Sequence, residues 1–220
     1  MLRSSEISDG KEKMELETLR YDFCEMFDID KRESALELFG KIVEKYESED
    51  RAYHNLEHIK NFLVFLEKFE QKIKDARGLK LAAWLHDVVY DTRAKDNEEQ
   101  SAKYAEDYLK SLGVSGEITN HVIALIRATA NHKLIGDDPD SEIFLDGDLA
   151  ILGSSDDEYD SYAKKIRQEY AWVPDDQYRE GRRKILENFL NTPRIYFTEE
   201  AGKELEQRAR KNLKREIDSL

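Results

Sequence analysis

Adjacent histidine and aspartate residues at positions 86 and 87 follow an apolar stretch with the spacing of a buried helix face. Leu79, Ala82, His86 and Tyr90 recur at helical intervals, so the imidazole of His86 is expected to face the core. A buried polar group without a hydrogen bond costs about 1–3 kcal/mol, and a buried carboxylate must be paired or bound to a metal. His86 and Asp87 therefore indicate either a metal site or a core histidine bonded to a backbone carbonyl beside a helix-terminal aspartate.

A second inward-facing histidine is expected on a helix that starts near Tyr53. His58 lies on the same face as Phe62, and His54 precedes it by one helical turn, so the two imidazoles stack on one face. Antiparallel packing of this helix against the helix that carries His86 would bring His58 and His86 together.

Two aspartates interrupt the otherwise apolar run from residue 143 to residue 153. A solvated loop would not place Phe144 and Leu149 around Asp146 and Asp148. One interpretation is a helix N-terminus, where Asp146 would cap the helix and the negative charge of Asp148 would interact favourably with the helix dipole. The other interpretation is that one of the two aspartates binds a metal.

The candidate ligands in chain order are His58, His86, Asp87 and Asp148. Two imidazoles and two carboxylates suit a divalent ion, and Mn, Co, Ni, Fe, Mg and Zn all remain open. Four protein ligands on a six-coordinate ion leave positions for a water and for a substrate oxygen. Such an ion lowers the pKa of the water and offsets phosphate charge.

The elements that must position these residues are predicted to be helices. The 220 residues include only 3 Pro and 10 Gly, and no Val/Ile/Thr-rich alternating run occurs. We find no internal repeat, linker or composition shift. The sequence therefore predicts an all-α fold, with a frayed tail over residues 1–11 and one compact helical bundle over residues 12–220.

Charge and cysteine content limit the class of partner. The net charge of −13 argues against a nucleic-acid polymer, because phosphate neutralisation needs a basic surface. No run approaches about 18 apolar residues, so we expect no membrane span. A single cysteine, Cys24, fits a reducing compartment, and the N-terminus has no apolar signal segment. These features predict a cytoplasmic protein.

The pattern of His58, His86-Asp87 and Asp148 resembles the H…HD…D signature of the HD-domain metal-dependent phosphohydrolases, an all-helical superfamily. The resemblance spans roughly residues 50 to 220 and extends to motifs of one subfamily generally described as predicted phosphohydrolases. The stretches that carry it are YHNLEHI at 53–59, WLHDVVYD at 84–91, DNEEQSA at 96–102, DGDLAILG at 146–153, IRQEYAWVP at 166–174 and GRR at 181–183.

The resemblance implies roles for individual residues. His58, His86, Asp87 and Asp148 would be the metal ligands, with Asp148 preferred over Asp146 as the last of them. His54 also resembles the opening histidine of cyclic-nucleotide phosphodiesterases and would be the general acid, although it could instead be a helix-start histidine that contacts backbone. Asp91 would complete the catalytic group by orienting water. Residues expected to bind substrate or to support the ligands are Arg51, Asn55, Glu98, His132, Asp146 and Arg167; Lys103, Arg182 and Arg183 are further candidate phosphate clamps.

The implied function is metal-dependent hydrolysis of a small phosphorylated metabolite, such as a nucleotide, by attack of a metal-bound water. Two alternatives remain open. One is a di-iron HD-type oxygenase, which His132 and His121 would support, although His121 is expected to pack at the edge of its helix. The other is a metal- or ligand-binding sensor without turnover. The long final helix could pack against a second copy of the chain, so a homo-oligomer also remains open.

Overall fold

Helix-forming residues and few chain breakers give a helical molecule. The computed structural model describes residues 15–220 and contains no β-strand within that range, so the all-α prediction is confirmed. The expected tail over residues 1–11 lies outside the described residues. A helix that includes residues 15–25 precedes the labelled elements. These are η1 (Ile29–Lys31), α2 (Arg32–Tyr46), α3 (Leu56–Glu67), α4 (Ala76–Leu85), α5 (Asn97–Ser111), α6 (Gly116–Thr129), α7 (Pro139–Asp148), η2 (Ala150–Gly153), α8 (Asp156–Glu169), α9 (Asp175–Asn191) and α10 (Glu199–Ser219).

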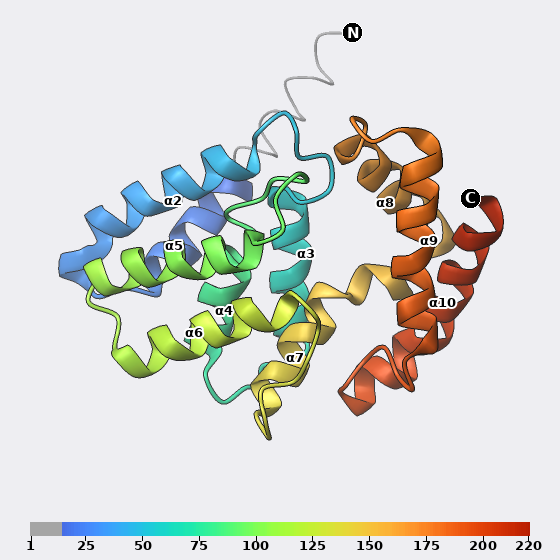
Figure 1. The fold of residues 1–220 in the computed structure, drawn as a ribbon. Helices are drawn as coiled ribbons and strands as arrows, with labels where there is room; N and C mark the ends of the chain where they lie inside the picture. Colours follow the sequence, from blue (N-terminus) through green and yellow to red (C-terminus); the bar gives the residue numbers. More distant parts are fainter. Residues whose placement is uncertain (1–14) are drawn as a thin grey trace, which may run out of the picture.

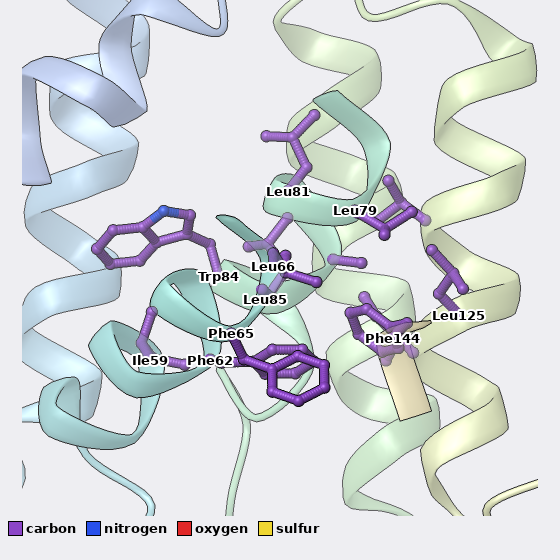
Figure 2. Close-up of a cluster of buried hydrophobic side chains, with 14 of the residues drawn as sticks. Ile59, Phe62, Phe65, Leu66, Leu79, Leu81, Trp84, Leu85, Leu125 and Phe144 are labelled. Atoms are coloured by element: carbon purple, nitrogen blue, oxygen red, sulfur yellow. The ribbon is translucent and has the colours of Figure 1, made fainter. Parts of the chain in front are cut away.

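The core around the predicted ligands is formed by α3, α4, α6 and α7 (Figure 2). Phe62 of α3, Leu79 and Leu85 of α4 and Leu125 of α6 are buried in one apolar cluster. Phe144 of α7 packs on Phe62 with ring centroids 4.9 Å apart. Burying a side chain of this size contributes about 1.5–3 kcal/mol. The cluster therefore holds α3, α4 and α7, the helices that carry or immediately precede the predicted ligands, in fixed relative positions.

The helices form two groups, with α2 to α7 on one side and α8 to α10 on the other (Figure 1). Buried hydrogen bonds join the groups: Asn212 Nδ2 of α10 donates to the carbonyl of Leu152 at 3.0 Å. The hydroxyl of Tyr196 donates to the carbonyl of Leu149 at 3.0 Å. Among the helices within residues 15–220, none has the length and apolar character needed to cross a bilayer.

Candidate metal centre

His58 is presented by the first turn of α3, and Asn55 starts that helix. Asn55 Oδ1 accepts the amide of Glu57 at 2.9 Å, and its Nδ2 donates to a backbone carbonyl at 3.0 Å. The helix begins at Leu56, later than the sequence predicted. Both ends of the Asn55 amide are used by the backbone at the start of the helix that carries His58, and the prediction that Asn55 binds substrate or supports the ligands stays a prediction.

His86 follows directly after the last residue of α4. Its amide donates to the carbonyl of Ala82 at 2.8 Å, and its Nδ1 lies 2.9 Å from the carbonyl of Ala83. This second contact assigns the ring proton to Nδ1 and leaves the lone pair of Nε2 available to a metal. The predicted helical stripe does not continue to Tyr90, because α4 ends at Leu85 and the chain turns there.

Asp146 and Asp148 lie in the last turn of α7, so the interpretation of a helix N-terminus is wrong. Side chains two residues apart on an α-helix point about 200° apart. Asp146 faces α10, where it accepts the amides of Phe197 at 2.6 Å and Thr198 at 2.8 Å. Burial raises the pKa of Asp146 to about 6. Asp146 thus joins α7 to the start of α10, whereas Asp148 faces the histidines; the prediction that Asp146 binds substrate or supports the ligands stays a prediction.

The side chains of His58, His86, Asp87 and Asp148 converge, and we call them the metal-ligand cluster. His58 Nε2 lies 3.1 Å from His86 Nε2. Asp148 Oδ1 lies 3.6 Å and 3.5 Å from these two nitrogens. Asp87 Oδ2 lies 3.9 Å from Nε2 of His58 and 3.0 Å from Nε2 of His86. Ligand atoms of His58, His86 and Asp148 all lie within 4.8 Å of one another, and Asp87 adjoins both histidines, so it could complete the set.

The separations fit the coordination of one divalent ion. Ligand atoms bound at about 2.1 Å lie about 3.0 Å apart on perpendicular axes and about 4.2 Å apart on opposite sides. Two unprotonated Nε2 atoms at 3.1 Å repel each other unless a proton or a cation lies between them. The donor set of two imidazoles and two carboxylates is one that Mn, Fe, Co, Ni and Zn accept. The cluster could therefore hold a metal ion.

Charges within the cluster favour a bound cation. Burial opposes ionisation of Asp87 and Asp148, but the neighbouring imidazoles outweigh burial and lower the pKa of both carboxyls. Burial also opposes protonation of His86, and the charges of Asp87 and Asp148 outweigh it and raise the His86 pKa. For His58, burial together with the charge of His86 lowers the pKa to about 4. Two buried carboxylates thus meet one imidazole that stays neutral, which leaves negative charge for a cation to offset.

His132 joins the cluster through Asp148. Its Nε2 lies 3.1 Å from Asp148 Oδ2, the oxygen opposite the one that faces His58 and His86. The backbone of His132 has φ 49°, a left-handed conformation that costs a non-glycine residue of the order of 1 kcal/mol. Its ring also meets Phe189 of α9, with centroids 5.8 Å apart. The predicted involvement of His132 at the site therefore has a structural basis, in support of Asp148.

His54 is held beside the cluster by a residue that the sequence reasoning missed. Glu169, the last residue of α8, lies with Oε2 2.7 Å from His54 Nδ1. Its Oε1 accepts the amides of Tyr53 at 2.7 Å and His54 at 2.9 Å, and its Oε2 accepts the Tyr90 hydroxyl at 3.0 Å. The ring of Tyr90 stacks on His54 at 4.1 Å. Glu169 lies within the stretch IRQEYAWVP at 166–174 that contributes to the family resemblance, but nothing in that stretch indicated a partner more than a hundred residues away.

Glu169 carries its charge in a buried position. Its side chain has no exposed surface, whereas that of His54 is 20% exposed. Burial opposes ionisation of Glu169, but the hydrogen bonds from His54 and from the amides of Tyr53 and His54 outweigh it and lower its pKa. The carboxylate therefore fixes the His54 ring with Nδ1 occupied and Nε2 free.

Arg51 is buried and supports the backbone of the cluster. Its guanidinium donates to the carbonyls of Asp87 at 2.7 Å, Val88 at 3.1 Å and His54 at 3.3 Å. It also lies over the ring of Tyr90, 5.6 Å from the centroid. These contacts place Arg51 in support of the ligand segment, as expected, and correct its proposed use as a phosphate clamp.

Asp91 belongs to the loop that follows the cluster. Its Oδ1 accepts the amide of Arg93 at 2.8 Å, and its backbone exchanges hydrogen bonds with the Asn97 side chain at 3.0 and 2.9 Å. Asp91 is exposed, and no hydrogen bond or ion pair within residues 15–220 joins it to the cluster. The predicted role of Asp91 in orienting water stays a prediction. Glu98 lies in the first turn of α5, where its negative charge interacts favourably with the positive end of the helix dipole.

The two best arginine candidates for a phosphate clamp are engaged elsewhere. Arg167 donates to the carbonyl of Tyr170 at 2.6 Å and to Asp175 at 2.5 Å, and so braces the turn between α8 and α9. Arg182 is buried in an ion pair with Glu216 at 2.7 Å. The expected clamp roles are corrected for both, because their hydrogen bonds hold helices together.

His121 forms a second histidine–aspartate group, which we call the His121 cluster. His121 Nδ1 lies 3.3 Å from Asp75 Oδ2, and its Nε2 lies 2.9 Å from Asp138 Oδ2. Ligand atoms of His121, Asp138 and Asp140 lie within 4.8 Å of one another. His121 thus does more than pack at a helix edge: it connects the N-cap residues of α4 and α7.

Comparison of the chain with protein-family models, with curated proteins and with solved structures found no match in any of the three. The resemblance to HD-domain phosphohydrolases therefore stays a prediction from the motifs, and the functional argument depends on the geometry of the cluster.

Proposed function

We propose that the protein is a metal-dependent phosphohydrolase of the HD type that acts on a small phosphorylated metabolite. The observation that carries this proposal is the convergence of four ligand atoms beside a histidine that a buried carboxylate orients. Structural metal sites surround their ion with protein ligands, whereas four ligands here would leave positions on a six-coordinate ion open.

His58, His86, Asp87 and Asp148 would hold the ion. When bound, it would supply the acidity that activates a water and the positive charge that offsets a phosphate. The chain would contribute rigid placement of the ligands: Arg51 fixes the carbonyl of Asp87, and the Ala83 carbonyl fixes the ring of His86.

His54 would transfer the proton. With Nδ1 bonded to Glu169, its Nε2 is the atom that can donate a proton to a leaving oxygen. The Glu169 carboxylate would hold the ring in the orientation that the donation requires, as a carboxylate does for a catalytic histidine in other hydrolases. Tyr90, stacked on the ring, limits its rotation.

The neighbouring cavity supports a small substrate. A space of about 360 Å³ lies between α3, η2 and α8 and has His58 in its wall. Cavities of about 300–1,000 Å³ hold small molecules in other proteins. Asn61, Ser161 and Tyr53 line it, together with Glu158 and with Glu57 and Lys165, which pair with each other at 2.6 Å. The amide and hydroxyl groups could hydrogen-bond a sugar or base that carries the phosphate.

The test is phosphate release from a panel of nucleotides and sugar phosphates after chelation and reloading with Mn, Co, Ni, Fe, Mg or Zn. We expect metal-dependent release by the wild type. His54→Gln should keep its metal and lose about 10²–10⁴-fold in rate, which is the usual contribution of a general acid. Glu169→Gln should show a smaller loss and a shifted pH profile, because the histidine keeps a hydrogen bond but loses the buried charge.

Three outcomes would overturn the proposal. Metal-loaded protein that releases no phosphate from any substrate would favour a sensor. Oxygen uptake that requires two irons per chain would favour the oxygenase. An unchanged rate in His54→Gln would show that another group donates the proton.

A further inference from the structure

We propose that a groove between α2 and α5 binds the phosphate group of a small molecule, at a site separate from the metal-ligand cluster. The groove has a volume of about 500 Å³, and residues 88–90, which follow the ligand Asp87, line part of it. We call it the lysine–tyrosine groove, after Lys41, Lys45, Tyr104 and Tyr108.

Two lysines on one face of α2 supply positive charge. Lys41 and Lys45 are one turn apart, and their ammonium groups lie over the rings of Tyr108 and Tyr104, 5.2 Å and 5.3 Å from the centroids. Within residues 15–220 neither lysine forms an ion pair, although the chain carries a net charge of −13. Other lysines of the protein, such as Lys165, do pair with glutamates. The two ammonium groups therefore remain available to an anion.

Two tyrosines on one face of α5 supply hydrogen-bonding groups. The rings of Tyr104 and Tyr108 lie 4.5 Å apart, and Lys41 donates to the Tyr108 hydroxyl at 3.4 Å. The Tyr104 hydroxyl oxygen is buried and lies beside the Tyr108 hydroxyl, so the two phenols form one hydrogen-bonding edge of the groove. Burial raises the pKa of the Tyr104 phenol, so this group is a donor at neutral pH.

A phosphate group fits this combination. It has several acceptor oxygens, so it can meet two ammonium groups and one phenol together, and charge-assisted hydrogen bonds are the strong ones. Glu44 and Asp50 also line the groove with negative charge, and the positive charges of Lys41, Lys45 and Arg51 outnumber them. Arg51 adds positive potential, although its own hydrogen bonds are committed to the carbonyls described above.

The experiment is calorimetric titration of the full-length chain with inorganic phosphate and, separately, with glycerol phosphate. A chelator is present throughout, so phosphate cannot bind through a metal, and the result is independent of the proposed hydrolase activity. We expect one saturable site per chain. If only the ester binds, the groove recognises a phosphorylated metabolite, and if both bind equally, it recognises the phosphate group alone.

Variants locate the site. The double variant Lys41→Gln/Lys45→Gln should weaken binding at least about tenfold, and Tyr104→Phe about fivefold. The matched control is Lys80→Gln/Lys214→Gln, which removes the same charge from exposed positions on α4 and α10 and should leave binding within about twofold. Absence of saturable binding at millimolar concentrations of both probes would overturn the proposal, as would equal losses in the two double variants.

Discussion

The metal-ligand cluster and the His121 cluster contain the same residue types but differ in how their hydrogen bonds are used. In the His121 cluster, both nitrogens of His121 face carboxylates, and Asp140 accepts the amides of Lys74 at 2.8 Å and Asp75 at 2.7 Å. In the metal-ligand cluster, two Nε2 atoms face each other with no backbone donor between them. The protein itself satisfies the first group, whereas the two Nε2 atoms of the second need a proton or a cation between them. Histidine–aspartate proximity alone therefore does not identify a metal site.

The largest expected difference is in metal binding. Asp148→Ala should lower the affinity for Mn or Co at least about 100-fold, since even partners that only support ligands contribute 10–100-fold. Asp138→Ala removes a carboxylate from the His121 cluster and should leave the metal content unchanged. Metal content is measured by elemental analysis after dialysis, and unfolding curves check that both variants fold. Loss of metal in Asp138→Ala alone would reverse the assignment of the two clusters.

A second, intermediate effect is expected on stability. Asp140 is buried and both of its oxygens accept backbone amides. Asp140→Asn replaces one acceptor with a donor that faces an amide, so unfolding in urea should show a loss of about 1–3 kcal/mol. Metal affinity should stay at the wild-type value. A variant that is as stable as the wild type but binds metal less well would contradict the structural role of this cluster.

The smallest effect concerns pH. Burial opposes protonation of His121, but its hydrogen bonds to Asp138 and Asp75 outweigh burial and raise its pKa. The stability that protonated His121 contributes to the fold is therefore fully present below the unfolded-state pKa of about 6.5. It is lost as pH rises through the higher folded-state pKa. The stability difference between wild type and His121→Gln should be below about 1 kcal/mol and should shrink as pH rises from about 6 to about 9. A stability difference between wild type and His121→Gln that grows as pH rises would contradict this prediction.

Local patterns in the sequence were sufficient for the fold class and for which residues would converge. Helical spacing and the scarcity of glycine and proline predicted helices, and the inward position of His58 and His86 predicted their meeting. The end of α4 at Leu85 could not be predicted, because the apolar spacing continues to Tyr90 while the chain already turns. The sequence also could not separate Asp146 from Asp148 by chemistry, since the difference depends on which helix face each occupies.

The sequence-based predictions mainly missed hydrogen-bond partners that are far apart in the chain. Glu169 meets His54 across more than a hundred residues, and the buried guanidinium of Arg51 donates to the carbonyls of Asp87 and Val88, more than thirty residues away. These roles depend on how α8 packs against α3 and on where the chain turns after α4. Neither property leaves a periodic pattern in the sequence.

The position of Glu169 also has a consequence for the order in which the site is completed during synthesis. The ribosome has made all four residues of the metal-ligand cluster once Asp148 is added, but the anchor of His54 is made only at Glu169. The amides of Phe197 and Thr198, which donate hydrogen bonds to Asp146, are synthesised later still. A nascent chain therefore contains the metal-ligand cluster before it can anchor the His54 ring, and α7 lacks its hydrogen bonds to residues 197 and 198 until the last helix begins.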